Sequence, residues 1–301
     1  MKNSATTLQL ATFFVTTATL LASPTIALGQ KVAPTAAPTP APPPAPAPAA
    51  TAAPLPTADA IFARAVTASG GADLIRMQTS RTQTGTIEMA AQSLKGTIVT
   101  KSVDPNMLLI ETDIPSFGKI RQGVNGTVGW AIDPMRGASL MTADEVARIT
   151  RESSIAAELN PAVGCDAPVV EEQTSFGGEP CFKVKLKCGQ DVSSRFYSVN
   201  SGLLIGSVAS VKSPMGEFEV TTINKNFEAF SGRMIAKVQD NSMMGQVQTL
   251  TISAVDFGPI DPAAFALPPE IQALVKAAKN PSPAPTTPPH APVAPTIPAK
   301  K

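Results

Sequence analysis

The chain has 301 residues, and its 24 basic and 23 acidic side chains leave a formal net charge of +1. No run of basic residues is longer than two, so the sequence offers no electrostatic footprint for nucleic acid. The one histidine, His290, lies in a proline-rich segment near the end of the chain. This excludes Ser-His-Asp and Cys-His catalysis, and most kinds of zinc site, from the folded part of the chain.

The two ends of the chain differ in composition from the centre. Residues 1–29 carry a lysine, a short apolar run and small residues in that order, which is the layout of a secretory signal peptide. A retained N-terminal membrane anchor is the alternative. Residues 30–56 and 280–301 consist largely of Pro, Ala and Thr, which favours an extended linker and a disordered tail. We therefore predict one domain over residues 57–279, exported to the periplasm or cell envelope, with no transmembrane segment in the mature chain.

The first part of this domain predicts two short helices followed by strands. Thr57 is a candidate N-cap for a helix that ends at Gly70-Gly71, where glycine supplies a left-handed C-cap. A second helical turn is expected over residues 72–77. From Ser80 onward apolar and polar residues alternate, which predicts five strands. Short turns join them, so the strands must be antiparallel neighbours.

The last two of these strands contain the strongest local signal in the sequence. Asn125-Gly126 lies between two alternating segments, the pattern of a hairpin with a type I′ turn. A two-residue loop there places Arg121 opposite Trp130. Trp130, the one tryptophan of the chain, shares a face with Ile132. That face must pack either under a helix of the protein or against a ligand.

The second half repeats the scheme. Residues 142–145, Thr-Ala-Asp-Glu, form a capping box and predict a helix of about fifteen residues that ends at Asn160-Pro161. A hairpin that turns at Gly177-Gly178 begins a further run of strands, and a closing helix is expected over residues 270–279. Residues 240–245 are read as an irregular loop between two strands.

About ten or eleven antiparallel strands are too many for a flat open sheet. The fold class predicted is therefore α+β, with a curved antiparallel sheet that forms an unclosed half-barrel. About three helices are expected to pack on its open side.

Three cysteines follow the export signal, so a disulfide is allowed. Cys181 and Cys188 lie on one predicted strand with side chains on opposite faces. The hairpin turn places Cys165 diagonally from Cys188 on the same face. We predict a Cys165–Cys188 disulfide with Cys181 free and buried; three free thiols in the core are the open alternative.

The remaining candidate catalytic groups have structural explanations. Ser116 and Lys119 match a Ser-x-x-Lys pattern, but in a connection between strands rather than at a helix start. Among the paired carboxylates, Glu145 caps a helix, Glu171 can pair with Lys183 across strands, and Glu217 and Glu219 lie on one strand face. We therefore predict no enzymatic activity, no cofactor and no metal site.

The order of these parts resembles a known superfamily. The shared features are a helix that ends in Gly-Gly, a meander with Asn-Gly, Gly-Trp and Asp-Pro, an internal helix, the strand Gly-Gly-x-Pro-Cys-Phe-Lys-Val-Lys-Leu and the turn Asn-x-Gly-Leu-Leu. Together they look like outer-membrane lipoprotein-sorting proteins, the superfamily of the periplasmic carrier LolA and its receptor LolB, over residues 57–267. The resemblance implies an unclosed barrel whose apolar cavity holds acyl chains. The carriers themselves are shorter and lack such linkers, and we assign their lid-locking arginine to no residue here.

If the Trp130 face lines such a cavity, Arg121 could meet an anionic head group or stack on the indole. The candidate cavity wall then consists of Trp130, Arg121, Ile132, Met89, Leu109, Phe117, Phe196 and Phe218. Met243 and Met244 form a candidate lid, with a disordered loop as the alternative.

The leading prediction for function is a monomeric, non-enzymatic carrier or binding protein for a lipid or an acylated lipoprotein. A structural or interaction module of the cell envelope, with a filled core, no ligand and a protein partner, is the alternative.

Overall fold

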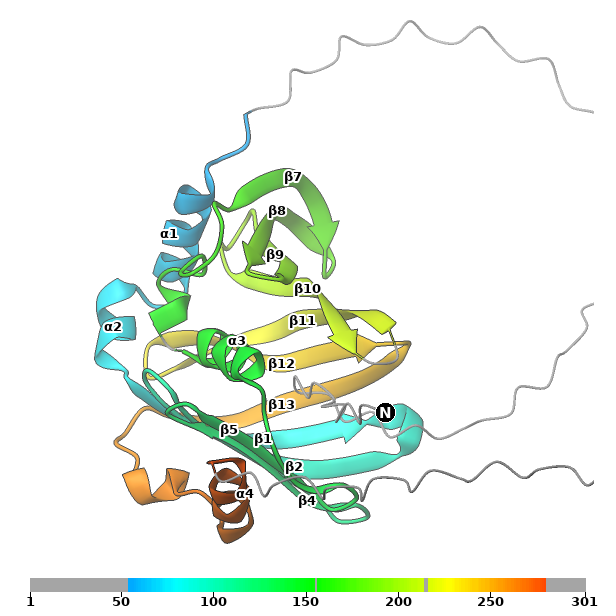
Figure 1. Ribbon diagram of the computed structural model, residues 1–301. Helices are drawn as coiled ribbons and strands as arrows, with labels where there is room; N and C mark the ends of the chain where they lie inside the picture. The colour runs from blue at the N-terminus through cyan, green and yellow to red at the C-terminus, as the bar shows by residue number, and fades with distance from the viewer. Residues whose placement is uncertain (1–53, 155, 214–215, 280–301) are drawn as a thin grey trace, which may run out of the picture.

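The computed structural model describes residues 54–154, 156–213 and 216–279. The predicted signal peptide (1–29), nearly all of the linker (30–56) and the tail (280–301) lie outside the described residues. The described residues form one antiparallel sheet of thirteen strands with four α-helices (Figure 1). None of the helices in these ranges has the length and hydropathy needed to cross a bilayer.

The elements, in chain order, have the following bounds. The helices are α1 (Ala58–Ala68), α2 (Ala72–Met77), α3 (Ala143–Ser153) and α4 (Pro269–Lys279), with short 3-10 turns η1 (Ala90–Gln92), η2 (Ala156–Glu158) and η3 (Pro262–Phe265). The strands are β1 (Ser80–Met89), β2 (Leu94–Val103), β3 (Met107–Ile114), β4 (Gly118–Asn125), β5 (Val128–Asp133), β6 (Gly137–Leu140), β7 (Val169–Phe176), β8 (Glu179–Cys188), β9 (Asp191–Ser198), β10 (Leu204–Ser213), β11 (Gly216–Phe230), β12 (Arg233–Met243) and β13 (Gln246–Asp256).

The sheet consists of two meanders joined in the middle. Strands β1 to β6 follow one another in space, as do β7 to β13, and the two sets meet where β1 pairs with β13. The outer strands β6 and β7 do not pair with each other, so the sheet is unclosed, as predicted. The short strand β6 is one that the sequence pattern does not predict.

Helices cover both faces of the sheet. Leu108 and Leu109 are neighbours on β3 and therefore point to opposite faces. Leu108 packs in a cluster with Val146 of α3, whereas Leu109 packs with Ile271 of α4. We call the α3 side the inner face; Figure 1 shows the sheet curving round α3, with α4 on its outer side. Helix α4 therefore covers the face opposite to the one that α3 covers.

Helix α1 covers the end of the inner face that is formed by β8 and β9. Thr57 caps it, as predicted, by accepting a hydrogen bond from the Ala60 amide at 3.3 Å. Phe62 packs edge-on against Tyr197 of β9, with ring centroids 5.6 Å apart. The other buried members of this cluster are Ala58, Ile61, Val184 and Leu186.

Helix α3 begins with the predicted capping box. The Thr142 amide donates to Glu145 Oε2 at 2.7 Å, and the Glu145 amide donates to Thr142 Oγ1 at 3.3 Å. The helix has 11 residues rather than about fifteen. It stops because Ser154 is extended, with ψ at 128°, and its hydroxyl donates to Asp104 Oδ1 at 3.2 Å. Gly129 allows α3 to approach the sheet, since a Cβ there would lie 2.5 Å from Val146 Cγ2.

The hairpin between β4 and β5 forms, but its register differs from the prediction. Asn125 pairs with Val128, so Gly126 and Thr127 are the loop residues. Arg121 consequently pairs with Ile132 instead of Trp130. Two long-range contacts account for the shift. The Asn125 side chain donates to the Phe265 carbonyl at 2.9 Å, and the Gly126 amide donates to the Asn106 carbonyl at 3.2 Å.

The predicted loop at 240–245 is instead the end of a long hairpin. Strand β12 continues to Met243, and only Met244 and Gly245 form the turn to β13. The polar residues are accommodated in the ladder because they have cross-strand partners. Asp240 accepts from Lys225 at 2.6 Å, and the buried Asn241 accepts from Thr222 Oγ1 at 2.9 Å.

Candidate functional site

The connection between the two edge strands decides the shape of the inner face. Strand β6 ends one side of the sheet and β7 ends the other, so residues 141–168, here the crossing segment, must pass over the whole inner face. This segment contains α3 and η2. A space remains between it and the strands beneath.

Two arginines, the largely enclosed Arg81 and the buried Arg233, fasten the crossing segment to the sheet. Glu158 of η2 accepts a hydrogen bond from Arg81 of β1 at 3.0 Å and another from Arg233 of β12. Arg233 is 1% exposed and also donates to the Ser69 carbonyl at 3.1 Å and to Gln78 Oε1 at 3.2 Å. Burial, with a contribution from Arg81, lowers the pKa of Arg233 to about 10. One carboxylate therefore pairs with two cations, of which Arg233 is buried.

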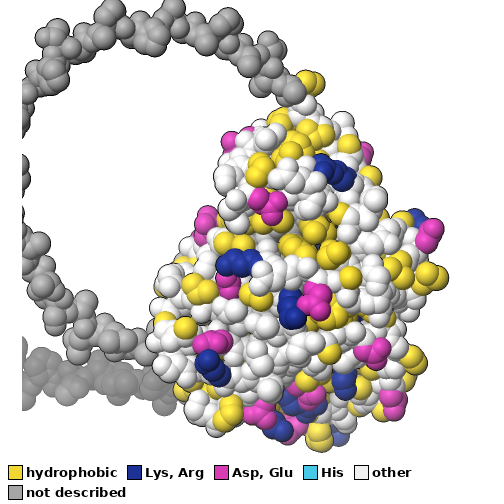
Figure 2. Space-filling view, turned by 180° about the vertical axis from the view of Figure 1, so that it is seen from behind, with side chains coloured by type: hydrophobic (Ala, Val, Ile, Leu, Met, Phe, Trp, Pro, Cys, Tyr) yellow, Lys and Arg dark blue, Asp and Glu magenta, His cyan; other side chains and the backbone are white. Residues whose placement is uncertain are grey.

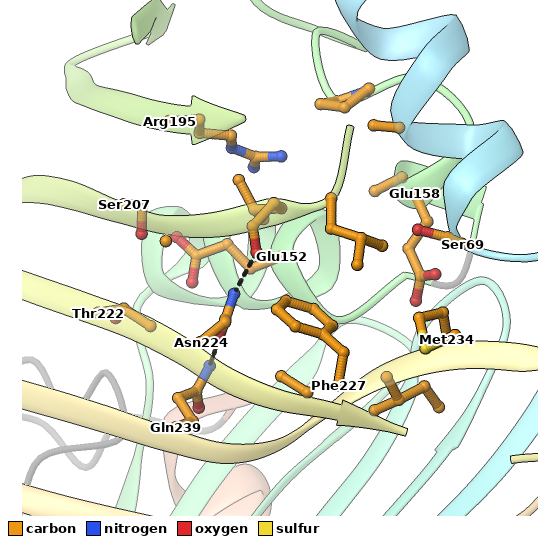
Figure 3. A pocket seen from close by; sticks show the side chains of 18 of the residues that line it. Ser69, Glu152, Glu158, Arg195, Ser207, Thr222, Asn224, Phe227, Met234 and Gln239 are labelled. Atoms are coloured by element: carbon orange, nitrogen blue, oxygen red, sulfur yellow. Dashed lines mark hydrogen bonds between the residues drawn. The ribbon is translucent and has the colours of Figure 1, made fainter. Parts of the chain in front are cut away.

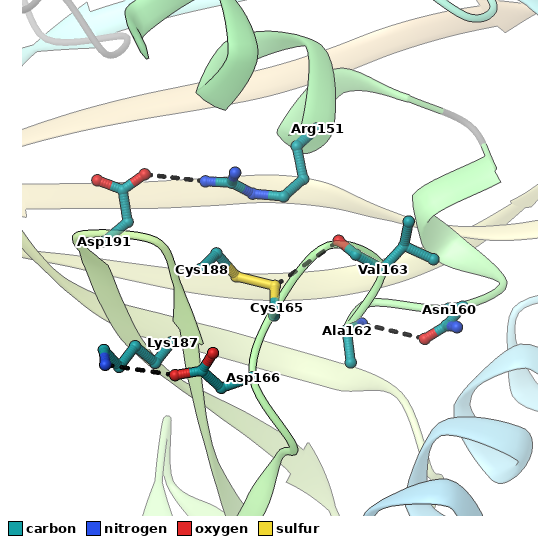
Figure 4. Close-up of a disulfide and its surroundings, with 9 residues drawn as sticks. All are labelled: Arg151, Asn160, Ala162, Val163, Cys165, Asp166, Lys187, Cys188 and Asp191. Atoms are coloured by element: carbon teal, nitrogen blue, oxygen red, sulfur yellow. Dashed lines mark hydrogen bonds and ion pairs between the residues drawn. A yellow bond between two sulfur atoms is a disulfide. The ribbon is translucent and has the colours of Figure 1, made fainter.

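A disulfide holds the far end of the crossing segment (Figure 4). The structure joins Cys165 to Cys188 at the end of β8, the pair predicted from the sequence, and leaves Cys181 free and buried. Nearby, Arg151 of α3 pairs with Asp191 of β9 at 2.9 Å. A disulfide is consistent with an oxidising compartment.

The space under the crossing segment is a cavity of about 500 Å³. This size is within the range of about 300–1,000 Å³ that is usual for small-molecule sites. Strands β1 and β9 to β13 form its floor, and α1 and the crossing segment form its roof. Its apolar lining includes Ala65, Leu203, Leu204, Phe227, Met234, Ile235, Leu250 and Ile252. Figure 3 shows the Phe227 ring directed into the middle of this space.

Polar side chains gather at one end of the cavity (Figure 3). Arg195 of β9 points inward there, above Glu152 of α3. On the floor, Gln239 donates to Asn224 Oδ1 at 3.1 Å, and Asn224 donates to the Leu204 carbonyl at 3.0 Å. The side-chain amides of Gln239 and Asn224 therefore have hydrogen-bond partners, whereas the charged side chains of Arg195 and Glu152 face the cavity.

Glu152 lines the cavity and is accessible from it. Its side chain is 53% exposed and pairs with Arg148 at 3.4 Å. Burial raises the pKa of Glu152, and the nearby Asp191 adds to the rise. Arg148, Arg151 and Arg195 oppose the rise.

Buried polar atoms without a hydrogen bond of standard geometry border the same space. The hydroxyl of Tyr197, a residue that is 2% exposed, makes no hydrogen bond of standard geometry. Burial raises the pKa of Tyr197, and its interaction with the nearby Arg195 opposes the rise. Arg81 Nε likewise makes no such hydrogen bond. Such atoms usually bond to ordered water or to a ligand.

A second cavity of about 260 Å³ adjoins the first between α3 and strands β3 and β4. Gln83, Glu152 and Gln239 line both cavities. The buried Gln122 Oε1 borders the second cavity and lacks a partner. The two cavities therefore lie end to end along the inner face.

The structure places Trp130 in the core rather than at these cavities. It is 2% exposed and packs with Ile132, Leu109 and Phe265 beneath α4 on the outer side of the sheet. Arg121 pairs with Glu111 at 3.0 Å while its guanidinium carbon lies 5.6 Å from the Trp130 ring centroid. Its side chain is 37% exposed, so it is a surface ion pair stacked on a core residue.

The other predicted wall residues lie apart. Met89 and Phe117 share a small cluster with Ile114. Phe196 alternates with the cavity-lining Arg195 and Tyr197, so it points to the other face and stacks on Phe176 at 3.8 Å. Phe218 shares the inner-face alternation of β11 but does not line either cavity. None of the eight predicted wall residues lines either cavity.

The candidate lid residues lie at the tip of a hairpin. Met243 is the last residue of β12, and Met244 is 58% exposed in the turn with a positive φ of 52°. Neither lines the two cavities. Their role as a lid stays a prediction.

The paired carboxylates have the structural partners predicted for them. Glu145 completes the capping box, and Glu171 pairs with Lys183 at 2.9 Å. In the described ranges, no three His, Cys, Asp or Glu residues gather as a metal site would require. Figure 2 shows basic and acidic side chains interspersed over the back of the molecule.

The cavity residues were not among those selected from the sequence. Arg195 and Glu152 are 43 residues apart in the sequence, and each reads locally as an ordinary surface charge. One signal was available: the crossing segment joins two edge strands, so its charged residues must come to lie over the inner face.

A scan against protein-family models and a search of curated proteins give no match. The chain is similar to several solved structures. One is a LolA superfamily protein, NE2245, from Nitrosomonas europaea, with 14% sequence identity and a TM-score of 0.49; the match covers 71% of this chain and 99% of that chain. A domain named for outer membrane lipoprotein sorting, from Vibrio parahaemolyticus, has 10% identity and a TM-score of 0.43, covering 64% and 93%. A DUF1329 family protein from Desulfovibrio piger has 11% identity and a TM-score of 0.45, and the match covers 69% of this chain and 98% of that chain.

The superfamily named from the sequence is thus represented among these structures. At such identities and TM-scores, the similarities say nothing about what this chain binds.

Proposed function

We propose that the chain is an exported, non-enzymatic binding protein that shelters the acyl chain of a lipid or lipoprotein between the sheet and the crossing segment. The observation that supports this most directly is the cavity of about 500 Å³ on the inner face. About half of its lining residues are apolar, among them Phe227, Leu250 and Ile252. Along this apolar part of the wall an acyl chain would be favoured over water.

The route into the cavity is consistent with a ligand that is held and released. The crossing segment covers the inner face of the sheet alone. The edge strands β6 and β7 do not pair, so the barrel stays unclosed along that seam. Arg81 and Arg233 hold the segment down through Glu158. Their ion pairs can separate without any change in the strand ladders.

A cavity-filling variant tests the proposal. Leu250 lines the cavity from β13, whereas Val247 on the same strand is exposed. Leu250→Trp puts an indole into the cavity, and Val247→Trp is the matched control at the surface. In a titration with a fluorescent fatty acid, we expect the wild-type chain and Val247→Trp to bind one molecule per chain, and Leu250→Trp to bind at least about tenfold more weakly, the effect of roughly 1.4 kcal/mol of lost contact. Equal binding by Leu250→Trp and the wild type would place the ligand elsewhere.

A further inference from the structure

The charged groups at the polar end of the cavity do not balance. Three arginines, Arg148, Arg151 and Arg195, lie around two carboxylates. Glu152 is paired with Arg148 at 3.4 Å, and Asp191 is paired with Arg151 at 2.9 Å. Arg195 has no ion pair within the described part of the chain. One positive charge therefore remains in the cavity wall without an anion.

The position of Arg195 is fixed by the sheet. It lies on the inner face of β9, where it pairs with Val184 of β8 and Ser207 of β10. Its side chain is half-buried and points into the cavity (Figure 3). A guanidinium presents a planar set of N–H donors that matches a carboxylate in two parallel hydrogen bonds.

A second donor lies beside it. Tyr197 is two residues further along β9 and so on the same face. It is 2% exposed and lines the cavity, and its hydroxyl interacts with Arg195 but makes no hydrogen bond of standard geometry. The hydroxyl and the guanidinium can therefore donate together to one bound anionic oxygen.

We infer that Arg195 and Tyr197 form the head-group site of the cavity and that its ligand is a monoanionic amphiphile, with a carboxylate at Arg195 and an apolar chain along Phe227, Leu250 and Ile252. This inference rests on the proposed function, since it specifies the ligand class of the same cavity. Arg195 supplies one positive charge at this end of the cavity, which matches a head group with one negative charge. Glu152 is adjacent and paired, so it would disfavour a dianion.

The test compares two probes of equal chain length. Palmitate carries a carboxylate, and hexadecanol carries an uncharged hydroxyl. For the full wild-type chain we expect palmitate to bind about tenfold more tightly than hexadecanol, the usual effect of a charge-assisted hydrogen bond in a partly buried site. Arg195→Gln should weaken palmitate binding more than hexadecanol binding and so remove the preference, whereas Arg195→Lys should keep part of it. Arg76→Gln is the matched control, because it removes one surface cation on α2 that is 63% exposed.

The outcomes separate the two proposals. Equal affinity of the wild type for both probes would overturn the head-group site and leave the acyl cavity standing. A palmitate preference that survives Arg195→Gln would overturn the assignment to Arg195. No binding of either probe would overturn the proposed function itself. Circular dichroism confirms that each variant is folded, and if Arg195→Gln does not fold, Arg195→Lys and the wild-type ratio still decide the matter.

Discussion

Replacing Glu158 should destabilise the protein more than any change to a surface ion pair. Glu158→Gln removes the one carboxylate that Arg81 and Arg233 share. Arg233 is 1% exposed, so water cannot replace the lost partner. Removing one partner of a buried ion pair usually costs about 3–5 kcal/mol. Because the Glu158 side chain is 32% exposed, we expect the lower end, about 3 kcal/mol of unfolding free energy.

Equilibrium unfolding in urea, followed by far-UV circular dichroism at pH 7, measures this loss. Asp73→Asn is the control, because its pair with Arg76 is exposed at 63% and 96% and should contribute less than about 1 kcal/mol. The double variant Glu158→Leu with Arg233→Met should recover part of the lost unfolding free energy. It removes the buried charge of Arg233 together with its partner, so that charge is no longer left without a carboxylate. Equal stability of Glu158→Gln and Asp73→Asn would refute the reasoning.

Three further predictions follow from the cysteines and from Glu152. Replacing Cys165 and Cys188 by serine should lower the unfolding free energy by about 3 kcal/mol, as expected for a closed loop of this length, measured in the same urea titration. Burial raises the pKa of Cys181 to about 11, so a maleimide should leave the native thiol unmodified at pH 7.5 and label it in urea; rapid native labelling would show that the site opens. Burial raises the pKa of Glu152, so its charged form opposes folding above that pKa and the penalty fades as the pH falls. Glu152→Gln should therefore melt at a higher temperature than the wild type at pH 8, with the difference vanishing below about pH 4; an equal or lower melting temperature at pH 8 would contradict this.

Most helices and strands could be predicted from the sequence because the residues that determine them lie within a few positions of one another. Thr57 and Thr142 cap their helices with atoms three residues away. The alternation of Lys183 with apolar neighbours on β8 predicted both its exposed face and its pairing with Glu171. The unclosed sheet followed from the number of such strands and their short connections.

The errors arose where a distant residue decides the outcome. The Asn125 side chain bonds to Phe265, 140 residues away, and the hairpin register shifts accordingly. The sequence left open whether a helix or a ligand covers the Trp130 face, and α4 covers it, because an amphipathic pattern does not say which side of the sheet a helix will meet. Residues 240–245 read as a loop because their polar groups find partners only across β11 and β13.

The candidate site was the least predictable part for the same reason. A cavity is the space that the crossing segment leaves over β9 to β13, and no single segment encodes it. Phe196 was chosen for its aromatic ring, yet its neighbours Arg195 and Tyr197 face the cavity because side chains alternate along β9. Charge balance around Arg195 could be assessed only after its neighbours were placed.

The most direct test of the central claim is the ligand content of the chain when it is produced with residues 1–29, the predicted export signal, and purified from the cell envelope without detergent. Native mass spectrometry, followed by solvent extraction, should find one amphiphile with an acyl chain per protein molecule, and Leu250→Trp should carry less of it than Val247→Trp. A wild-type chain that is empty in this experiment and remains empty after incubation with palmitate would contradict the account.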